Sequence, residues 1–140
     1  MSKIRVLAIA LLKNPKGQIL LHQGYDSAKK QVFYRPLGGG VDFSETAKVA
    51  LKREFQEELG KKIKVKKLVG VFENIFTYEN KDRHEIVFVY TATFSSLKDY
   101  KKAYEIIEDK RVVGKAVWRT LKDMRKEKAP FYPAGLEQFI

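Results

Sequence analysis

Apolar residues near the start of the chain gather in two short runs separated by a polar turn. Residues 4–12 and 18–23 are rich in Ile, Leu and Val, a composition typical of β-strands. The segment Asn14-Pro15-Lys16-Gly17 between them has the residues of a tight turn. We therefore predict that these two runs form a β-hairpin.

A second pair of apolar runs lies in the middle of the chain. Residues 65–78 and 84–94 flank the polar segment 79–83, which predicts another hairpin. Apolar side chains occupy both alternating sets of positions in 84–94, so both faces of this strand should be buried or half-buried. Further elements are expected later in the chain: a strand at 115–121 and short helices at 121–127 and 134–139.

One helix is marked more clearly than the others, at about residues 45–59. Ser44 is the expected N-cap and Gly60 the expected C-cap. The glycine run 38–40 leads into the helix through a short loop, 41–43. Strands on both sides of a central helix predict an α/β fold, a mixed β-sheet sandwiched between α-helices.

Length and composition narrow the class of protein. The 140 residues, 44% of them hydrophobic, suit one domain covering residues 1–140. The first apolar run is too short to span a membrane, and without cysteine the chain has neither disulfides nor thiolate metal sites. We expect a cytoplasmic protein with no membrane partner. Its formal net charge of +11 favours anionic partners.

The predicted helix carries three carboxylates on one side. Glu54, Glu57 and Glu58 are three and four residues apart, so they are neighbours on the helix surface. They continue the stripe of Ala50 and Leu51, which should face inward. A divalent cation would relieve their repulsion, and oxygen ligands without His or Cys suit Mg²⁺ or Mn²⁺. Spacing alone leaves a second interpretation open, a solvated acidic face paired with lysines.

Residues 39–60 together resemble the Nudix box. Gly39 is followed after five residues by Glu45, and after seven more by Arg53-Glu54-Phe55-Gln56-Glu57-Glu58-Leu59-Gly60. All fixed polar and glycine positions of the family pattern match. Lys61 departs from the family pattern, which has an apolar residue at this position. The position serves packing at the helix exit.

The resemblance implies a Nudix fold and a metal-dependent hydrolase that cleaves a diphosphate bond in a nucleoside diphosphate linked to another group. It implies that Glu54, Glu57 and Glu58 bind Mg²⁺, with Mn²⁺ as an alternative and the carbonyl of Gly38 as a further ligand. By the same resemblance, Arg53 orients the glutamates by ion pairing. Family members are often homodimers, whereas the sequence of this chain does not by itself determine its oligomeric state.

The general base that activates water remains open at this stage. In the family it comes either from the box, here Glu57 or Glu58, or from a glutamate in a later loop. Glu105 and Glu108 lie roughly where some members place that loop. We predict Glu108 ahead of Glu105 among the loop residues, and Glu85 is a weaker candidate.

Residues just before the box are candidates for substrate binding. Phe33 or Tyr34 could stack on a base, and Arg35 could contact a phosphate. Gly39 lets the backbone approach a ligand closely. The alternative is that the aromatic residues pack in a strand and Arg35 is solvated.

The charge supports a second class of function. A net charge of +11 suits an RNA 5′-end pyrophosphohydrolase, or a nucleic-acid-binding protein that uses the Nudix fold without catalysis. A small nucleotide is the preferred substrate, because the acidic box is intact. The isolated His22 and His84 are interpreted as structural or surface residues.

Overall fold

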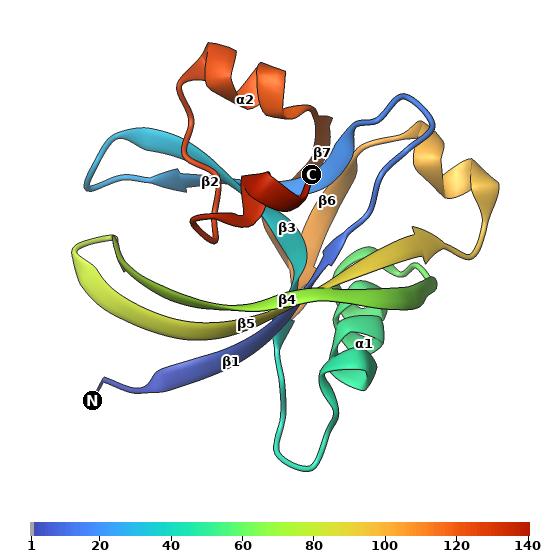
Figure 1. Cartoon of the computed structure of the whole chain (residues 1–140), viewed down its shortest axis with the longest axis horizontal. Helices are drawn as coiled ribbons and strands as arrows, with labels where there is room; N and C mark the ends of the chain where they lie inside the picture. The colour runs from blue at the N-terminus through green and yellow to red at the C-terminus, as the bar shows by residue number, and fades with distance from the viewer. Residues whose placement is uncertain (1) are drawn as a thin grey trace.

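The computed structural model describes residues 2–140, which form a seven-stranded mixed sheet in the order β4-β5-β1-β3-β2-β7-β6 (Figure 1). Only β1 and β5 run parallel; the other neighbours are antiparallel. The strands are β1 Ile4–Leu11, β2 Ile19–Asp26, β3 Gln31–Gly40, β4 Ile63–Tyr78, β5 Lys81–Phe94, β6 Tyr104–Glu108 and β7 Arg111–Arg119. The helices are α1 Ala47–Leu59, α2 Leu121–Glu127 and the 3₁₀ turns η1 Leu97–Lys101 and η2 Leu136–Phe139.

The chain turns between β1 and β2 as predicted, but the prediction that the two strands pair as a hairpin is wrong. Between β1 and β2 only a Lys13 to Ile19 bridge closes the turn, and β3 separates the two strands. The first part of β3, residues 31–36, pairs with β2, and its last part, residues 37–40, pairs with β1. The glycine run, expected before the loop, is therefore part of a strand, and β3 joins the two halves of the sheet.

The second predicted hairpin is confirmed. β4 and β5 pair antiparallel over their whole lengths, and Glu79 and Asn80 make the turn with φ of 51° and 62°. From His84 onward, β5 residues are buried or half-buried on both faces, as the pattern predicted. This hairpin forms one wall of the larger of the two cavities described below.

Helix α1 begins two residues later than predicted. Thr46, not Ser44, is the N-cap, and its hydroxyl accepts a hydrogen bond from the N–H of Val49. Ser44 has a φ of 68°, so it belongs to the turn that reverses the chain. Gly60 ends the helix in the left-handed region, with a φ of 66°, as expected.

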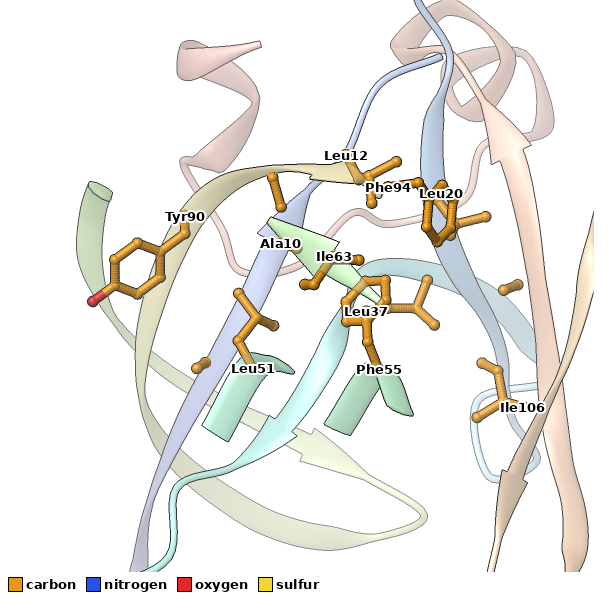
Figure 2. Close-up of a cluster of buried hydrophobic side chains, with 13 residues drawn as sticks. Ala10, Leu12, Leu20, Leu37, Leu51, Phe55, Ile63, Tyr90, Phe94 and Ile106 are labelled. Carbon is orange, nitrogen blue, oxygen red and sulfur yellow. The ribbon is translucent and has the colours of Figure 1, made fainter. Parts of the chain in front are cut away.

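The core has two layers, one on each face of the sheet. Leu51 and Phe55 of α1 pack on one face, against residues that include Ala8 and Ala10 (Figure 2). The other face of β1 packs against α2 and the C-terminal turn, through residues that include Met124. The sheet therefore lies between helices, which confirms the predicted α/β class.

Candidate active site

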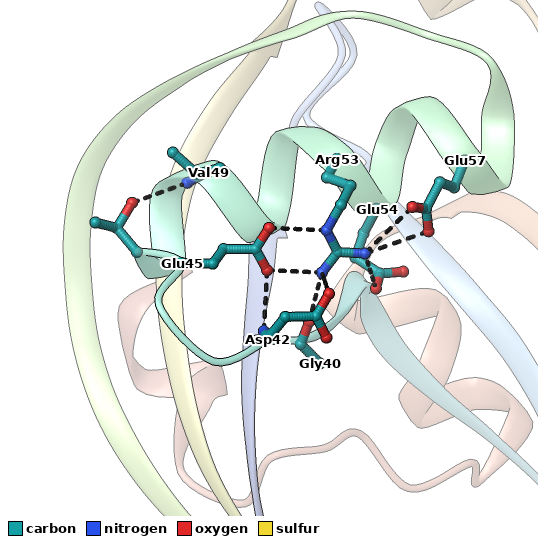
Figure 3. A network of polar contacts seen from close by, with 8 residues as sticks. Gly40, Asp42, Glu45, Val49, Arg53, Glu54 and Glu57 are labelled. Atoms are coloured by element: carbon teal, nitrogen blue, oxygen red, sulfur yellow. Dashed lines mark hydrogen bonds and ion pairs between the residues drawn. The ribbon is translucent and has the colours of Figure 1, made fainter.

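Arg53 is the centre of the polar network at the start of α1 (Figure 3). Its guanidinium forms a two-pronged pair with Glu45, in which Nε and Nη2 each donate across 2.8 Å. Nη2 also donates to the carbonyl of Gly40 at 2.9 Å. Glu45 in turn accepts from the backbone N–H of Asp42 at 3.0 Å. Arg53 therefore ties β3, the loop and the helix together.

The remaining guanidinium nitrogen of Arg53 reaches the carboxylate patch, which consists of Glu54, Glu57 and Glu58. Nη1 donates to Glu54 at 3.0 Å and to Glu57 at 3.3–3.4 Å. The Arg53 side chain is 27% exposed, so this pairing is only partly screened by water. The geometry agrees with the orienting role that the family resemblance implied for Arg53.

Two glycines of β3 let the backbone approach its neighbours closely. A Cβ on Gly38, whose φ is 154°, would lie 1.9 Å from the carbonyl oxygen of Ala8 on β1. A Cβ on Gly39 would lie 2.4 Å from the carboxyl carbon of Glu54. These contacts explain why two consecutive residues at the start of the box and just before it lack side chains: Gly38 allows strand pairing, and Gly39 leaves room for a carboxylate.

The three predicted metal ligands differ in environment. Glu58 is only 7% exposed, whereas the side chains of Glu54 and Glu57 are 15% and 57% exposed. Burial, with the neighbouring carboxyls of Glu54 and Glu108, raises the pKa of Glu58 to about 9. Burial also raises the pKa of Glu54. The inner part of the patch therefore holds more carboxyl groups than it can accommodate as anions.

This donor set fits a hard divalent cation. It consists of carboxylates with no thiolate, and a bound cation would stabilise the ionised form of a buried group such as Glu58. Within residues 2–140, however, no three metal-binding side chains converge in coordinating geometry. Glu54 and Glu57 are instead turned toward Arg53. Metal binding would require these side chains to reorient.

Two cavities lie side by side at the junction of the sheet halves. The smaller, of about 140 Å³, is lined by Gly38, Gly39 and Glu58 together with residues of β1, β2 and β6. The larger, of about 310 Å³, is lined mainly by β2, β3 and the β4/β5 hairpin. Four residues line both cavities and so mark where they meet: Arg5, His22, Arg35 and Glu108.

The substrate-binding candidates that precede the box lie in different surroundings in the structure. Arg35 lies at the junction of the cavities, where burial lowers its pKa and Glu85 opposes that effect. Phe33 lines the larger cavity. Tyr34 points to the other side of β3 and is fully buried in the core, where its hydroxyl donates to Glu127 at 2.6 Å. We therefore no longer consider Tyr34 a substrate contact.

The two β6 glutamates predicted as candidate general bases also differ in their position relative to the cavities. The segment expected to be a loop is strand β6, joined to β7 through Asp109 and Lys110 at φ of 48° and 64°. Glu108, at its end, lines both cavities and lies next to Glu58. Glu105 is exposed and lines neither cavity.

Several residues at the site had no clear signal in the sequence. His22, interpreted as structural, lies between the cavities, and its burial together with the Arg35 charge lowers its pKa to about 4, so it is neutral at pH 7. Glu85 is buried and pairs with Arg5 at 3.8 Å. The signal that the sequence offers for Glu85 is a carboxylate at the start of an otherwise apolar strand.

A carboxylate patch on the helix that follows the glycine-rich end of β3 therefore lies next to two cavities. A family model described as the NUDIX domain matches residues 3–139, so the chain belongs to the NUDIX family and is a Nudix pyrophosphohydrolase. Hydrolases of this family generally cleave compounds in which a nucleoside diphosphate is linked to another group.

Solved structures of other proteins share the fold of this chain. A NUDIX hydrolase from Nitrosomonas europaea superimposes with a TM-score of 0.67 at 18% identity, covering 97% of this chain and 85% of that one. A MutT protein from Methanosarcina mazei Go1 gives 0.61 at 20%, covering 99% and 91%. A MutT NUDIX hydrolase from Burkholderia pseudomallei gives 0.60 at 25%, covering 87% of each. No curated protein sequence matched.

No helix in residues 2–140 is long and apolar enough to cross a membrane.

The ion pair between Arg53 and Glu45 should make the stability of the fold depend on pH in the acid range. Hydrogen bonds from Arg53 and from the Asp42 N–H lower the pKa of Glu45 from its usual 4.5 to about 2. A lowered folded-state pKa stabilises the fold above the unfolded value, and this contribution is lost as pH falls from about 4.5 toward 2. Glu45→Gln should therefore be less stable than wild type at pH 7, and the difference should shrink across that range.

Urea unfolding of both proteins at pH 7, 5, 4 and 3 measures this difference. Glu137→Gln is the control: Glu137 is exposed and makes no ion pair within residues 2–140, so this variant should match wild type at pH 7. A difference between Glu45→Gln and wild type that stays constant down to pH 3 would contradict the prediction.

Proposed function

We propose that this enzyme hydrolyses the diphosphate bond of nucleoside diphosphate derivatives with Mg²⁺ as its cofactor and Mn²⁺ as a substitute. The observation that carries the proposal is the meeting of the two cavities at Arg35 and Glu108. One cavity adjoins the carboxylates of α1, and the other has the size and aromatic lining of a nucleotide site. A substrate spanning both would place its diphosphate at their junction.

Glu54, Glu57 and Glu58, with the carbonyl of Gly38, would hold the cation. Bound there, Mg²⁺ supplies charge neutralisation at the phosphate oxygens and lowers the pKa of attacking water. Arg53 is a positioning residue that holds Glu54 and Glu57 beside the site through its Nη1 atom, and the two side chains would turn toward the cation when it binds. Glu45 is a positioning residue too, because it binds Arg53 and the N–H of Asp42.

Arg35 and Glu108 have opposite roles at the junction. The guanidinium of Arg35 donates no hydrogen bond to another residue within 2–140, so it is free to bind a phosphate. Glu108 lies beside Glu58 and is the residue we propose as general base, taking a proton from the attacking water. Water attacks one phosphorus, the bridging oxygen leaves with the other, and two phosphorylated products form.

A hydrolysis panel tests the proposal directly. Nucleoside triphosphates, nucleotide sugars and dinucleoside polyphosphates would each be incubated with the enzyme and Mg²⁺, and the products separated by ion-exchange chromatography. We expect turnover of at least one compound, lost with EDTA and restored by Mg²⁺. Absence of turnover across the whole panel, with Mg²⁺ or Mn²⁺, would reject the proposal for small nucleotides. An RNA carrying a 5′-triphosphate belongs in the panel, because the +11 charge favours such a polyanion.

Binding of Mg²⁺ should also raise the melting temperature. The cation binds the carboxylate patch of the native state, so at about 100 times its Kd it stabilises the fold by about 2.7 kcal/mol. The triple variant Glu54→Gln, Glu57→Gln, Glu58→Gln should show no such shift. NaCl at equal ionic strength is the control for screening. If the triple variant responds to Mg²⁺ like wild type, the cation binds elsewhere.

A further inference from the structure

The end of the larger cavity away from α1 contains an arginine that lies over the Tyr78 ring at 5.9 Å but has no hydrogen-bond or ion-pair partner for its side chain within residues 2–140. Arg83 of β5 lines this cavity and not the smaller one. Its Nε is shielded from solvent and has no hydrogen-bond partner within residues 2–140, and Arg83 forms no ion pair there. In contrast, the neighbouring cations Arg5 and Lys29 pair with Glu85 and Asp26. A desolvated N–H without an acceptor is unfavourable, so this position is suited to a ligand that brings an acceptor.

A second polar group lies on the same wall. Asn74 of β4 is 7% exposed, lines the larger cavity, and its side chain forms no hydrogen bond within residues 2–140. In the β4/β5 register Asn74 is opposite Glu85, and Phe76 is opposite Arg83, so this hairpin presents an amide, a guanidinium and an aromatic ring to one cavity.

Aromatic rings make up much of the remaining lining. Phe76 and Tyr132 stack with centroids 5.7 Å apart and an interplanar angle of 27°, and Phe33 packs edge-on against Tyr132 at 5.9 Å. Such a lining suits a planar ring. It suits a second phosphate less well, because the buried carboxylates of Asp26 and Glu85 line the same cavity. The planar group of a nucleotide is its base, and the diphosphate would lie at the other end, near Arg35.

The chemistry of the two polar side chains distinguishes between bases. A guanidinium donates hydrogen bonds and cannot accept them, whereas an amide does both. Hypoxanthine, guanine and uracil present an oxo group beside a ring N–H, so Arg83 can donate to the oxygen and Asn74 can accept from the N–H. Adenine and cytosine present an amino group in place of the oxo group. That amino group would meet the guanidinium donor to donor, and reorienting Asn74 does not remove this conflict.

We propose that Arg83 and Asn74 are specificity-determining residues that select nucleotides whose base carries an oxo group where adenine and cytosine carry an amino group. This inference rests on the proposed function for the diphosphate chemistry. The base preference itself depends only on the larger cavity, so it can be measured separately from hydrolysis.

The experiment uses pairs of nucleotides that differ at this one position. Hydrolysis of ITP against ATP, and of UTP against CTP, gives two ratios of kcat/KM. Calorimetric binding of IMP against AMP, and of UMP against CMP, gives the same comparison without Mg²⁺ or turnover. We expect the oxo compound to be favoured roughly 10- to 100-fold, the range of a hydrogen bond to a charged group. The variant Arg83→Met should bring the ratios to within about twofold, and Asn74→Leu should reduce them in part.

Arg111→Met is the matched control, because Arg111 is exposed on β7 and lines neither cavity; its ratios should equal those of wild type. Wild-type ratios near one in both pairs would overturn the inference and leave the proposed hydrolysis intact. Equal losses of kcat/KM for both members of a pair in Arg83→Met would also overturn it, because Arg83 would then contact a part common to both, such as a phosphate. Preferential binding of IMP and UMP without hydrolysis of any triphosphate would support the inference while rejecting the proposed reaction.

Discussion

Glu58→Gln is expected to reduce hydrolysis at least about 100-fold, the scale on which one preorganised electrostatic contact affects catalysis, and Glu57→Gln should also lose most activity. Glutamine keeps the volume of the side chain but brings no charge to a cation. Glu58 is 7% exposed, and burial raises its pKa to about 9, so a neutral amide suits its surroundings when no metal is bound. The Glu58→Gln variant should therefore melt in EDTA at or above the wild-type temperature.

Initial rates at saturating Mg²⁺, together with melting curves, separate loss of chemistry from loss of fold. Two further variants on β6 provide the comparison: Glu108→Gln should lose activity, whereas Glu105→Gln should not, because Glu108 lines both cavities and Glu105 lines neither. Wild-type rates in both Glu57→Gln and Glu58→Gln would contradict the assignment of the carboxylate patch as the metal site.

Gly38→Ala should have the largest effect on stability among alanine substitutions of the three glycines at the end of β3. Its Cβ would lie 1.9 Å from the carbonyl oxygen of Ala8, which is backbone on the paired strand and cannot rotate away. Separating β1 from β3 to relieve this overlap should cost about 3 kcal/mol or more. For a domain of this size the melting temperature should fall by roughly 10 °C.

The neighbouring glycines provide matched controls for that variant. A Cβ on Gly40 would be 3.6 Å from the Arg5 guanidinium, an ordinary contact, so Gly40→Ala should melt close to wild type. A Cβ on Gly39 would overlap the carboxyl of Glu54, the end of a side chain that can move. Gly39→Ala should therefore fold but lose activity, because Glu54 is displaced. Equal melting temperatures for the Gly38→Ala and Gly40→Ala variants would show that β3 can shift to accommodate the added methyl group.

Short-range features of this protein could be predicted from the sequence because their causes are local. The 3.6-residue period of the helix places Leu51 and Phe55 inward and Glu58 at the end of the same stripe. A glycine at the helix exit predicts the left-handed cap found at Gly60. The box spacing identified the family, because each of its residues acts within one loop and one helix.

Tertiary structure decided which of several equivalent residues reach the site. Phe33 and Tyr34 are adjacent and point to opposite faces of β3, and only the position of the sheet between its two core layers determines that Tyr34 is buried. The sequence favoured Glu108 over Glu105 by position only, whereas the packing of β6 places Glu108, and not Glu105, in the lining of both cavities.

The order of the strands in the sheet could not be predicted from local sequence patterns either. A turn at residues 14–17 indicates that the chain reverses there, but not that β3, later in the sequence, lies between β1 and β2. That insertion brings Arg35 and the glycines of β3 together with Glu58 and Glu108 at one junction. The residue types and their helical spacing were therefore determined by the sequence alone. The cavity in which they meet depends on pairings between segments far apart in the chain, and these are decided by which arrangement buries the most apolar surface.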